Sequence, residues 1–250
     1  MRKILLKICY DGTDFCGWQV QPNGISVQQR LCEALEDLLS EKVNVTGCSR
    51  TDSGVHANEF CCHFETANEK LSAESFAGAL NVRLPESISV IESCEVPSNF
   101  HARYDVKRKE YVYRMYYSRV RDPFKDKYSL RIFSPLDIKS VNNYCKLLVG
   151  THDFSAFSAS GREYDSTVRT IYDCKMEQRG NEYIFRVSGD GFLYNMVRIM
   201  VGTALYVSEG KLSLENIENA LKSGERSLLG PTAPPRGLFL NKVVYNDGSF

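Results

Sequence analysis

The stretch KILLKICY at residues 3–10 is typical of a buried β-strand and opens the pattern that decides the fold. A helix is predicted next, because Ser26 stands three residues before Gln29 as in a capping box and apolar residues then recur at helical spacing up to Leu39. Further strands and one further helix complete the set: strands at 43–47, 59–66 and 87–93, and a helix at 72–82. The order strand, helix, strand, strand, helix, strand is that of the ferredoxin-like βαββαβ fold.

The second half of the chain repeats this order with additional elements. Strands are predicted at 109–118, 168–178, 182–188 and 238–245, and helices at 137–149, 192–208 and 213–223. We therefore expect a mixed α/β protein of the α+β class, built from two ferredoxin-like halves around a central antiparallel sheet. The halves are predicted at residues 1–104 and 105–250. An active-site cleft is expected between them, because clefts of this kind are where sites occur.

Composition and charge exclude several classes of protein. The chain has 250 residues, of which 43% are hydrophobic and 25% charged, which is unlike a disordered chain or a coiled coil. Its 31 Lys and Arg balance 31 Asp and Glu, so a uniformly basic coat is excluded but a local basic patch is not. No apolar run approaches the ~20 residues of a membrane span, and the N-terminal sequence lacks a signal-peptide cleavage site.

The nine cysteines are odd in number, irregularly spaced and without a C-x-x-C pair. Zinc sites and disulfide frameworks need regular pairs, so neither is expected. The cysteines are interpreted as small buried side chains in a reducing cytoplasm.

The densest group of polar and ionisable residues is GCSRTDSGVHA at residues 47–57, between two predicted strands. Its plainest interpretation is a polar hairpin loop whose Asp and Ser side chains bond to their own backbone. A hydrolase using Ser53 and His56 is a second interpretation, although the chain contains no G-x-S-x-G turn. In a third, Asp52 is a carboxylate nucleophile that a nearby guanidinium keeps ionised.

The region of residues 101–131 is strongly basic within a neutral chain. It contains ten Lys or Arg against four acidic residues, with seven aromatic residues interleaved. Cations that follow phosphates and aromatic faces that stack on unpaired bases are typical of RNA recognition. A solvated strand face with core tyrosines is the alternative. The composition favours nucleic acid.

The motif G-x-x-R-T-D-x-G-V-H-A at residues 47–57 resembles the catalytic motif of the TruA-type tRNA pseudouridine synthases. Further segments resemble the same family, in its order, over essentially the whole chain: YDGTDFCGWQVQPNGISVQQRL at 10–31, ALNVRLP at 79–85, FHARYDVKRKEYVYR at 100–114, GTHDFSAF at 150–157, GFLYNMVRIMVG at 191–202 and GLFL at 237–240. Cys48-Ser49 and Asn58-Glu59 depart from the pattern around the motif without touching its Arg-Thr-Asp core.

The resemblance implies roles for individual residues. Asp52, in the N-terminal half, matches the nucleophilic aspartate, and Tyr111 matches the tyrosine that stacks on the target uracil. Arg198 matches the basic residue that pairs with the aspartate. Arg50 matches the arginine that helps extrude the target nucleotide, and Leu238 matches the apolar residue beside it. From its basic composition, the C-terminal half is expected to contact RNA through the cations that precede Tyr111, namely Lys107, Arg108 and Lys109.

The implied reaction is isomerisation of uridine to pseudouridine in the anticodon stem-loop of tRNA, at positions 38, 39 and 40. The family needs no cofactor and no metal, works as a homodimer with tRNA as its partner, and has no membrane association. We expect the same here, in the cytoplasm. The reaction requires flipping the target base out of its stack. A non-catalytic RNA-binding protein remains the rival, and it would need the aromatic residues but not Asp52 and Arg198.

Overall fold

The computed structural model describes residues 1–159 and 164–245, and it divides into two compact units. Unit 1 contains Met1–Lys107 and the chain from Phe239 onward, and unit 2 is Arg108–Leu238. The two units are described separately. The boundary that we predicted after residue 104 lies three residues before the structural one. The last strand, predicted in the second half, contributes all but its first residue to unit 1, because it pairs there with an early strand.

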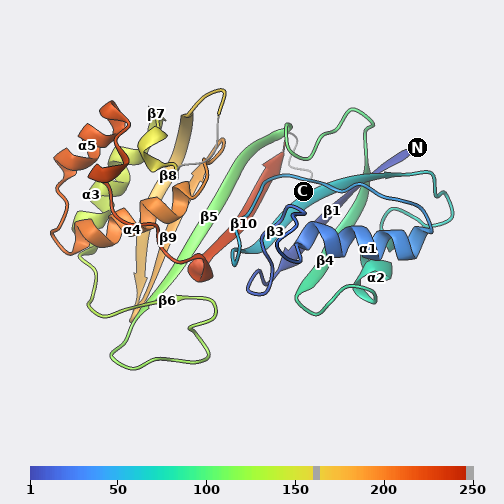
Figure 1. Cartoon of the computed structure of the whole chain (residues 1–250), viewed down its shortest axis with the longest axis horizontal. Coiled ribbons are helices and arrows are strands. Elements are labelled where there is room, and N and C mark those ends of the chain that lie inside the picture. The colour runs from blue at the N-terminus through green and yellow to red at the C-terminus, as the bar shows by residue number, and fades with distance from the viewer. Residues whose placement is uncertain (160–163, 246–250) are drawn as a thin grey trace. The chain divides into compact units, whose positions relative to one another are not determined.

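Unit 1 has the predicted order of elements (Figure 1). Helix α1 has its N-cap at Ser26, whose hydroxyl accepts the Gln29 amide, but the Gln29 side chain donates to Glu33 and leaves the capping box half formed. The elements are β1 (Arg2–Tyr10), α1 (Val27–Leu39), β2 (Thr46–Gly47), β3 (His56–Thr66), α2 (Ser75–Asn81), β4 (Ile88–Val96) and β10 (Leu238–Tyr245).

The sheet of unit 1 has the strand order β4-β1-β3-β10. β1 pairs antiparallel with both β3 and β4. The position beside β3 is shared: the two residues of β2 pair with its second half, and β10 runs parallel to its start, with Phe239 opposite His56. The strand predicted at 43–47 is therefore reduced to two residues.

Both faces of β3 are covered, which explains its almost unbroken burial. On one face Phe64 packs on Phe76 of α2. On the other, His63 contacts Phe100 and His101 of the segment that follows β4. The start of β3 lies inside the motif of residues 47–57, so the motif is anchored directly to the best-buried strand of unit 1.

Unit 2 repeats the pattern with two short strands that we did not predict, β6 and β7. The strand order is β5-β9-β8-β7, all antiparallel, while β6 pairs parallel with the end of β5. The remaining elements are β5 (Val106–Tyr117), β6 (Leu130–Ile132), α3 (Ile138–Leu148), β7 (Gly150–Asp153), β8 (Val168–Arg179), β9 (Glu182–Gly189), α4 (Met196–Ser208) and α5 (Leu214–Ser223).

Three helices of unit 2 form one layer, because α3 contacts α4, α5 and β8 (Figure 1). α4 is the most apolar of them, and most of its residues are buried. The expected α+β class and the two βαββαβ patterns are confirmed, with mixed rather than purely antiparallel strand pairing. No helix among the described residues is both long enough and apolar enough to pass through a bilayer.

Candidate functional site

The motif loop, residues 47–57, is held by the preceding loop that joins β1 to α1. The amide of Trp18 donates to the carbonyl of Thr51 at 3.2 Å, and the amide of Gly54 donates to the carbonyl of Phe15 at 3.3 Å. A turn within the motif closes when the amide of Val55 donates to the carbonyl of Asp52 at 3.1 Å. The backbone is thus fixed on both sides of Asp52.

Two glycines allow this close approach. A Cβ on Gly12 would lie 2.0 Å from the carbonyl oxygen of Val55, and one on Gly17 would lie 2.5 Å from that of Thr51. Gly17 also has φ 107°, a conformation that L-residues with a side chain rarely adopt. The glycines of the YDGTDFCGW segment are therefore required by the motif loop.

His56 and Ser53 do not form a hydrolase pair. His56 is fully buried, stacks on Phe239 with ring centroids 4.6 Å apart, and accepts the amide hydrogen of Gly12 at Nδ1. The hydroxyl of Ser53 donates to the carbonyl of Phe15. His56 thus anchors the end of the motif loop, and the hydroxyl of Ser53 is engaged by the backbone of Phe15 and not by His56.

Asp52 and Arg50 are both accessible from solvent, since Asp52 is partly buried and Arg50 is exposed. Between them, Thr51 is buried and its hydroxyl shares a hydrogen bond of 2.8 Å with the hydroxyl of Tyr10. Alternating side chains from a fixed backbone therefore present one carboxylate and one guanidinium. A carboxylate on so constrained a loop is suited to covalent or electrostatic chemistry, since it needs little reorganisation.

In unit 2, Tyr111 lies on β5 opposite Val187 of β9. Its ring is 6% exposed and meets the edge of Phe192 at 5.1 Å. Tyr113, two residues on and on the same face, donates its hydroxyl to the carbonyl of Pro234 at 2.8 Å. The two tyrosines have different surroundings, and Tyr113 is tied into the protein interior.

Arg198, on α4, has a guanidinium that is oriented by its own unit. Its Nε donates to the carbonyl of Ala233 at 2.7 Å, and its Nη1 donates to Oδ1 of Asn195 at 2.8 Å. Asn195 precedes the helix with φ 60°, an uncommon backbone conformation that Asn tolerates better than most residues. We did not predict this role for Asn195, which lies inside the helix predicted at 192–208 and precedes the observed helix.

The remaining predicted site residues also lie in defined surroundings. Leu238 is 5% exposed at the start of β10. The guanidinium of Arg108 donates to the hydroxyl of Ser188 at 2.7 Å and lies 5.8 Å from the ring centre of Tyr172. Lys109 lies on the β5 face that carries Tyr111, because residues two apart on a strand share a face. Lys107 precedes it on that face and is exposed.

The predicted site residues are divided between the two units. Asp52 and Arg50 lie in unit 1, whereas Tyr111, Arg198 and Leu238 lie in unit 2. Each unit therefore supplies some of the predicted site residues, and contacts within that unit hold them.

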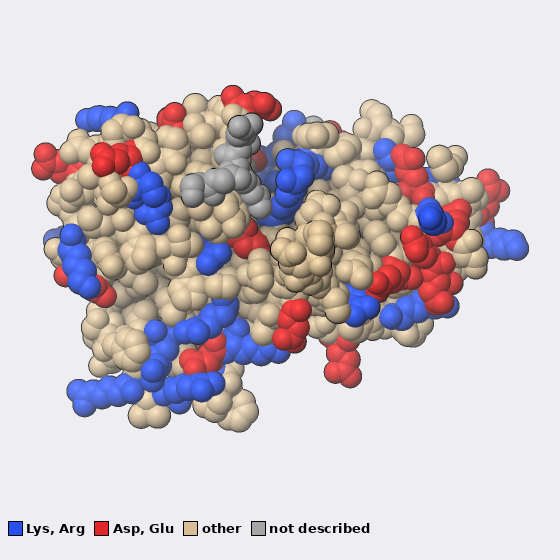
Figure 2. All heavy atoms as spheres, in the orientation of Figure 1, with Lys and Arg blue, Asp and Glu red and all other residues tan. Residues whose placement is uncertain are grey.

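The second part of the basic region forms a loop between β5 and β6. Figure 2 shows Lys and Arg side chains gathered there, at the lower left, with acidic groups among them. Arg121 pairs with Asp126 at 2.6 Å, and Lys125 pairs with Glu182 at 2.5 Å. Ion pairs within the unit therefore reduce the excess positive charge that the composition indicates.

No group of three or more His, Cys, Asp or Glu side chains placed to hold a metal ion occurs among residues 1–159 and 164–245. The nine cysteines are free thiols. Burial raises the pKa of Cys61 and Cys62 well above the ordinary value, so these thiols are poor nucleophiles and poor ligands.

Comparison with known proteins gives one consistent result. The family model described as tRNA pseudouridine synthase matches residues 8–105 and 144–246. The tRNA pseudouridine synthase A of Thermoanaerobacter sp. (strain X514) is 43% identical over 98% of this chain and all of its own length. That of Halalkalibacterium halodurans is 42% identical over 99% of this chain and 94% of its own.

Among solved structures, a Cbf5-Nop10-Gar1 complex matches with a TM-score of 0.38 and 13% identity, covering 96% of this chain and 50% of the matched chain. The sequence relationships extend over almost the full length of the chain and include the motif loop, Arg198 and Leu238. This chain belongs to the tRNA pseudouridine synthase family.

Proposed function

We propose that this protein converts uridine to pseudouridine at positions 38, 39 and 40 of the anticodon stem-loop of tRNA, with Asp52 as the nucleophile. The coarser statement, that the chain is an isomerase of the tRNA pseudouridine synthase family, follows from its relatives. The observation that carries the finer proposal is the motif loop, in which a solvent-accessible carboxylate stands on a backbone fixed from both sides.

In this reaction the glycosidic bond between C1′ and N1 breaks, the uracil turns while it is trapped, and C5 forms a bond to C1′. The hydrogen on C5 leaves as a proton, N1 takes up a proton, and the bond that the nucleophile forms breaks again, so the product has the composition of the substrate. We assign the nucleophilic attack to Asp52, on C1′ or on C6. Holding the detached uracil requires a flat wall and little water, and we assign the wall to Tyr111.

We assign pairing with the carboxylate of Asp52 to Arg198, because Ala233 and Asn195 already orient its guanidinium. An oriented guanidinium keeps a carboxylate ionised and loses little conformational freedom on pairing. Arg50 and Leu238 are assigned to extrusion of the target nucleotide, which costs a few kcal/mol that contacts to the RNA backbone must offset.

The test uses an unmodified tRNA transcript that carries tritium at C5 of its uridines. Formation of the bond from C5 to C1′ releases the tritium to water, and sequencing then locates the pseudouridine. We expect release with modification confined to positions 38–40. Modification elsewhere in the tRNA would contradict the assigned positions.

The rival function, RNA binding without chemistry, predicts a different outcome of the same experiment. The protein would then retain the tRNA on a filter, with strong dependence on salt, but release no tritium. Tight binding without release would therefore favour the rival.

We further propose that the protein acts as a homodimer in the cytoplasm, as the family resemblance implies and as nine free thiols suit. Sedimentation of the purified chain tests the dimer, and a species of monomer mass at working concentration would contradict it.

A further inference from the structure

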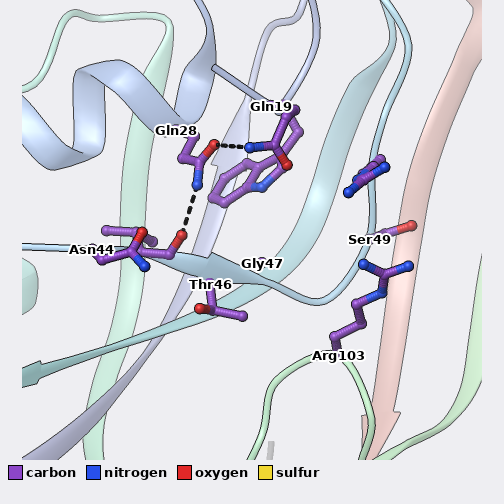
Figure 3. A pocket seen from close by; sticks show the side chains of 10 residues that line it. Gln19, Gln28, Asn44, Thr46, Gly47, Ser49 and Arg103 are labelled. Carbon is purple, nitrogen blue, oxygen red and sulfur yellow. Dashed lines mark hydrogen bonds between the residues drawn. The ribbon is translucent and has the colours of Figure 1, made fainter. Parts of the chain in front are cut away.

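A polar pocket of about 220 Å³ lies in unit 1 beside the motif loop (Figure 3). Its lining comes from four places in the sequence: the loop after β1, the first turn of α1, the chain entering the motif, and the segment before β5. Figure 3 shows Arg103 reaching toward the chain at Ser49, with Asn44 on the opposite side. The lining residues used below are Trp18, Gln19, Gln28, Asn44, Val45, Thr46, Gly47, Arg50 and Arg103.

The side chains that line the pocket include two cations and no acidic group. Arg50 and Arg103 both line it, and both are exposed. No ion pair joins either guanidinium to a carboxylate in the described part of the chain, and no Asp or Glu lines the pocket. By contrast Arg83, on the same unit, donates to Asp37 at 2.8 Å. Two guanidiniums without an anion form a site for a group with several acceptor oxygens.

The floor of the pocket is rigid. Trp18 is 2% exposed and stacks on Phe60 with centroids 4.1 Å apart. A Cβ on Gly47 would lie 2.5 Å from its ring, so the ring rests directly on the backbone. The buried amide of Gln28 accepts from Gln19 and from the amide of Val20, each at 3.0 Å, and donates to the carbonyl of Val45 at 2.8 Å.

The floor also offers a donor. The indole N–H of Trp18 has no hydrogen-bond partner among the described residues, and no fully buried side-chain nitrogen or oxygen of those residues lacks a partner. The indole nitrogen therefore keeps some accessible surface, on a side chain that lines the pocket. A fixed N–H donor in the wall of a cationic pocket favours an acceptor-rich ligand.

We propose that this pocket binds one phosphodiester group of the substrate RNA, next to the target uridine, with Arg103 as its main cation. The inference rests on the function proposed above. Arg50 lines the pocket and precedes Asp52 by two residues. An RNA strand that brings a uridine to Asp52 therefore carries its neighbouring phosphates past the pocket. The amides of Gln19 and Asn44 and the hydroxyl of Thr46 then face the adjoining ribose, whose 2′-hydroxyl both donates and accepts.

The experiment compares Arg103→Gln with Arg83→Gln, using filter binding to an anticodon stem-loop RNA at several salt concentrations. Arg103→Gln is expected to weaken binding about tenfold and to lower the slope of log K against log salt by about one, because one phosphate contact is lost. Arg83→Gln, already neutralised by Asp37, should leave both affinity and slope at the wild-type values. Thermal melting confirms that both variants are folded.

A second measurement identifies the phosphate. Single uncharged methylphosphonate linkages are placed in turn at each phosphate flanking the target uridine, and both proteins are titrated. At one position the methylphosphonate should weaken RNA binding by the wild type but should not further weaken binding by Arg103→Gln. The effects of the substitution and of the neutral linkage are then not additive. Additive losses at every position, or an Arg103→Gln protein that binds like Arg83→Gln, would overturn the inference.

Failure of the pocket is separable from failure of the proposed function. Tritium release by the wild type on the same RNA reports the function, whereas the titrations report the pocket. If the wild type releases tritium while Arg103→Gln binds RNA with wild-type affinity, the proposed phosphate site is contradicted and the proposed function is not.

Discussion

The motif loop and the basic region of residues 101–131 carry the two strongest sequence signals, and the structure treats them differently. In the motif loop, hydrogen bonds and glycine contacts from residues 12–18 hold the backbone around Asp52. In the basic region, several cations already have partners: Arg121 with Asp126, Lys125 with Glu182, and Arg131 over the ring of Phe133 at 4.6 Å.

This difference shows how much structural detail each kind of sequence signal predicts. A motif of fixed spacing describes one local geometry, because each residue type is required by a contact that the loop makes. A charge count describes only an excess, since it does not distinguish a cation that meets the ligand from one that pairs within the protein. The motif therefore predicts residues with definite positions. In the basic region, each cation must be tested separately for contact with RNA.

Gly12→Ala should lower both stability and activity, because it breaks the packing that holds the motif loop. The new Cβ would lie 2.0 Å from the carbonyl oxygen of Val55, so one loop must move. We expect a loss of about 2 kcal/mol in the free energy of unfolding, as for other overpacked sites, and a loss of tritium release of roughly 100-fold, since small misplacements are costly.

Gly78→Ala is the matched control for that variant. Gly78 lies in α2 with open space around it, so alanine should keep full activity and raise stability by up to about 1 kcal/mol. Urea unfolding and single-turnover rates measure both variants. A Gly12→Ala protein as active and stable as Gly78→Ala would show that the motif loop does not depend on its support.

Tyr111→Phe asks whether the basic region takes part in the chemistry or only in binding. Phenylalanine keeps the flat ring and removes the hydroxyl, whereas Tyr111→Leu removes both. We further assign removal of the C5 proton to the hydroxyl of Tyr111, so Tyr111→Phe should bind tRNA and lose turnover at least 100-fold, the usual scale for a missing general acid or base. Tyr113→Phe should remain active and lose about 1 kcal/mol of stability, because its hydroxyl serves Pro234. Full activity of both Tyr111 variants would remove this residue from the site.

Single substitutions of the three cations before Tyr111 would sort that part of the basic region. Lys109→Ala should lower the salt slope of tRNA binding by about one, since strand alternation places Lys109 on the Tyr111 face. Lys107→Ala should act in the same direction. Arg108→Ala should change the slope less, because its guanidinium is already engaged by Ser188 and Tyr172. Equal salt slopes of tRNA binding for all three single variants would mean that the contacts of each cation within the protein do not affect its contribution to RNA binding.

The smallest expected effect concerns His63, which anchors the start of the basic region. Its Nδ1 accepts the amide hydrogen of Ala102 at 3.1 Å. Burial, with Lys3 and His101 nearby, lowers the pKa of His63 from 6.5 to about 4. The unfolded chain therefore binds a proton between pH 6.5 and 4 that the folded chain does not, so stability falls as the pH drops through this window.

His63→Asn keeps an acceptor for Ala102 and has no titrating ring. Urea unfolding at pH 7 and pH 4.5 should show a smaller loss of stability in this variant than in the wild type. An identical loss in both proteins would assign the acid sensitivity to other groups.

Much of the fold could be predicted because its elements are set by local patterns. The periodicity of residues 27–39 and the alternation of residues 109–118 produced α1 and β5 nearly at their observed bounds. Pairing of β10 with β3 could not be predicted in this way, because Phe239 and His56 are joined by no local signal. That pairing joins Phe239 and Leu240 to His56 and Ala57 at the start of β3, and it places β10 from Phe239 onward in unit 1.

The candidate site was predictable to the same extent. Asp52 and Arg50 stand in a motif whose spacing is specific, whereas the support from Gly12, the orientation of Arg198 by Asn195 and the pocket beside Arg103 arise from contacts between distant segments. Asn195 illustrates the limit most clearly. Its role depends on one backbone angle and one side-chain hydrogen bond, neither of which has a sequence pattern.

The most direct test of the central claim is tritium release by Asp52→Asn. Asparagine keeps the size of the side chain and loses the nucleophile, so the barrier should rise by several kcal/mol. We predict tRNA binding within several-fold of wild type and no detectable release. Asp52→Glu should also fail, because its carboxylate is displaced by about 1 Å or more. Asp37→Asn, on the surface of the same unit, should release tritium at the wild-type rate. Appreciable turnover by a folded Asp52→Asn protein would contradict the assignment of Asp52 as the nucleophile.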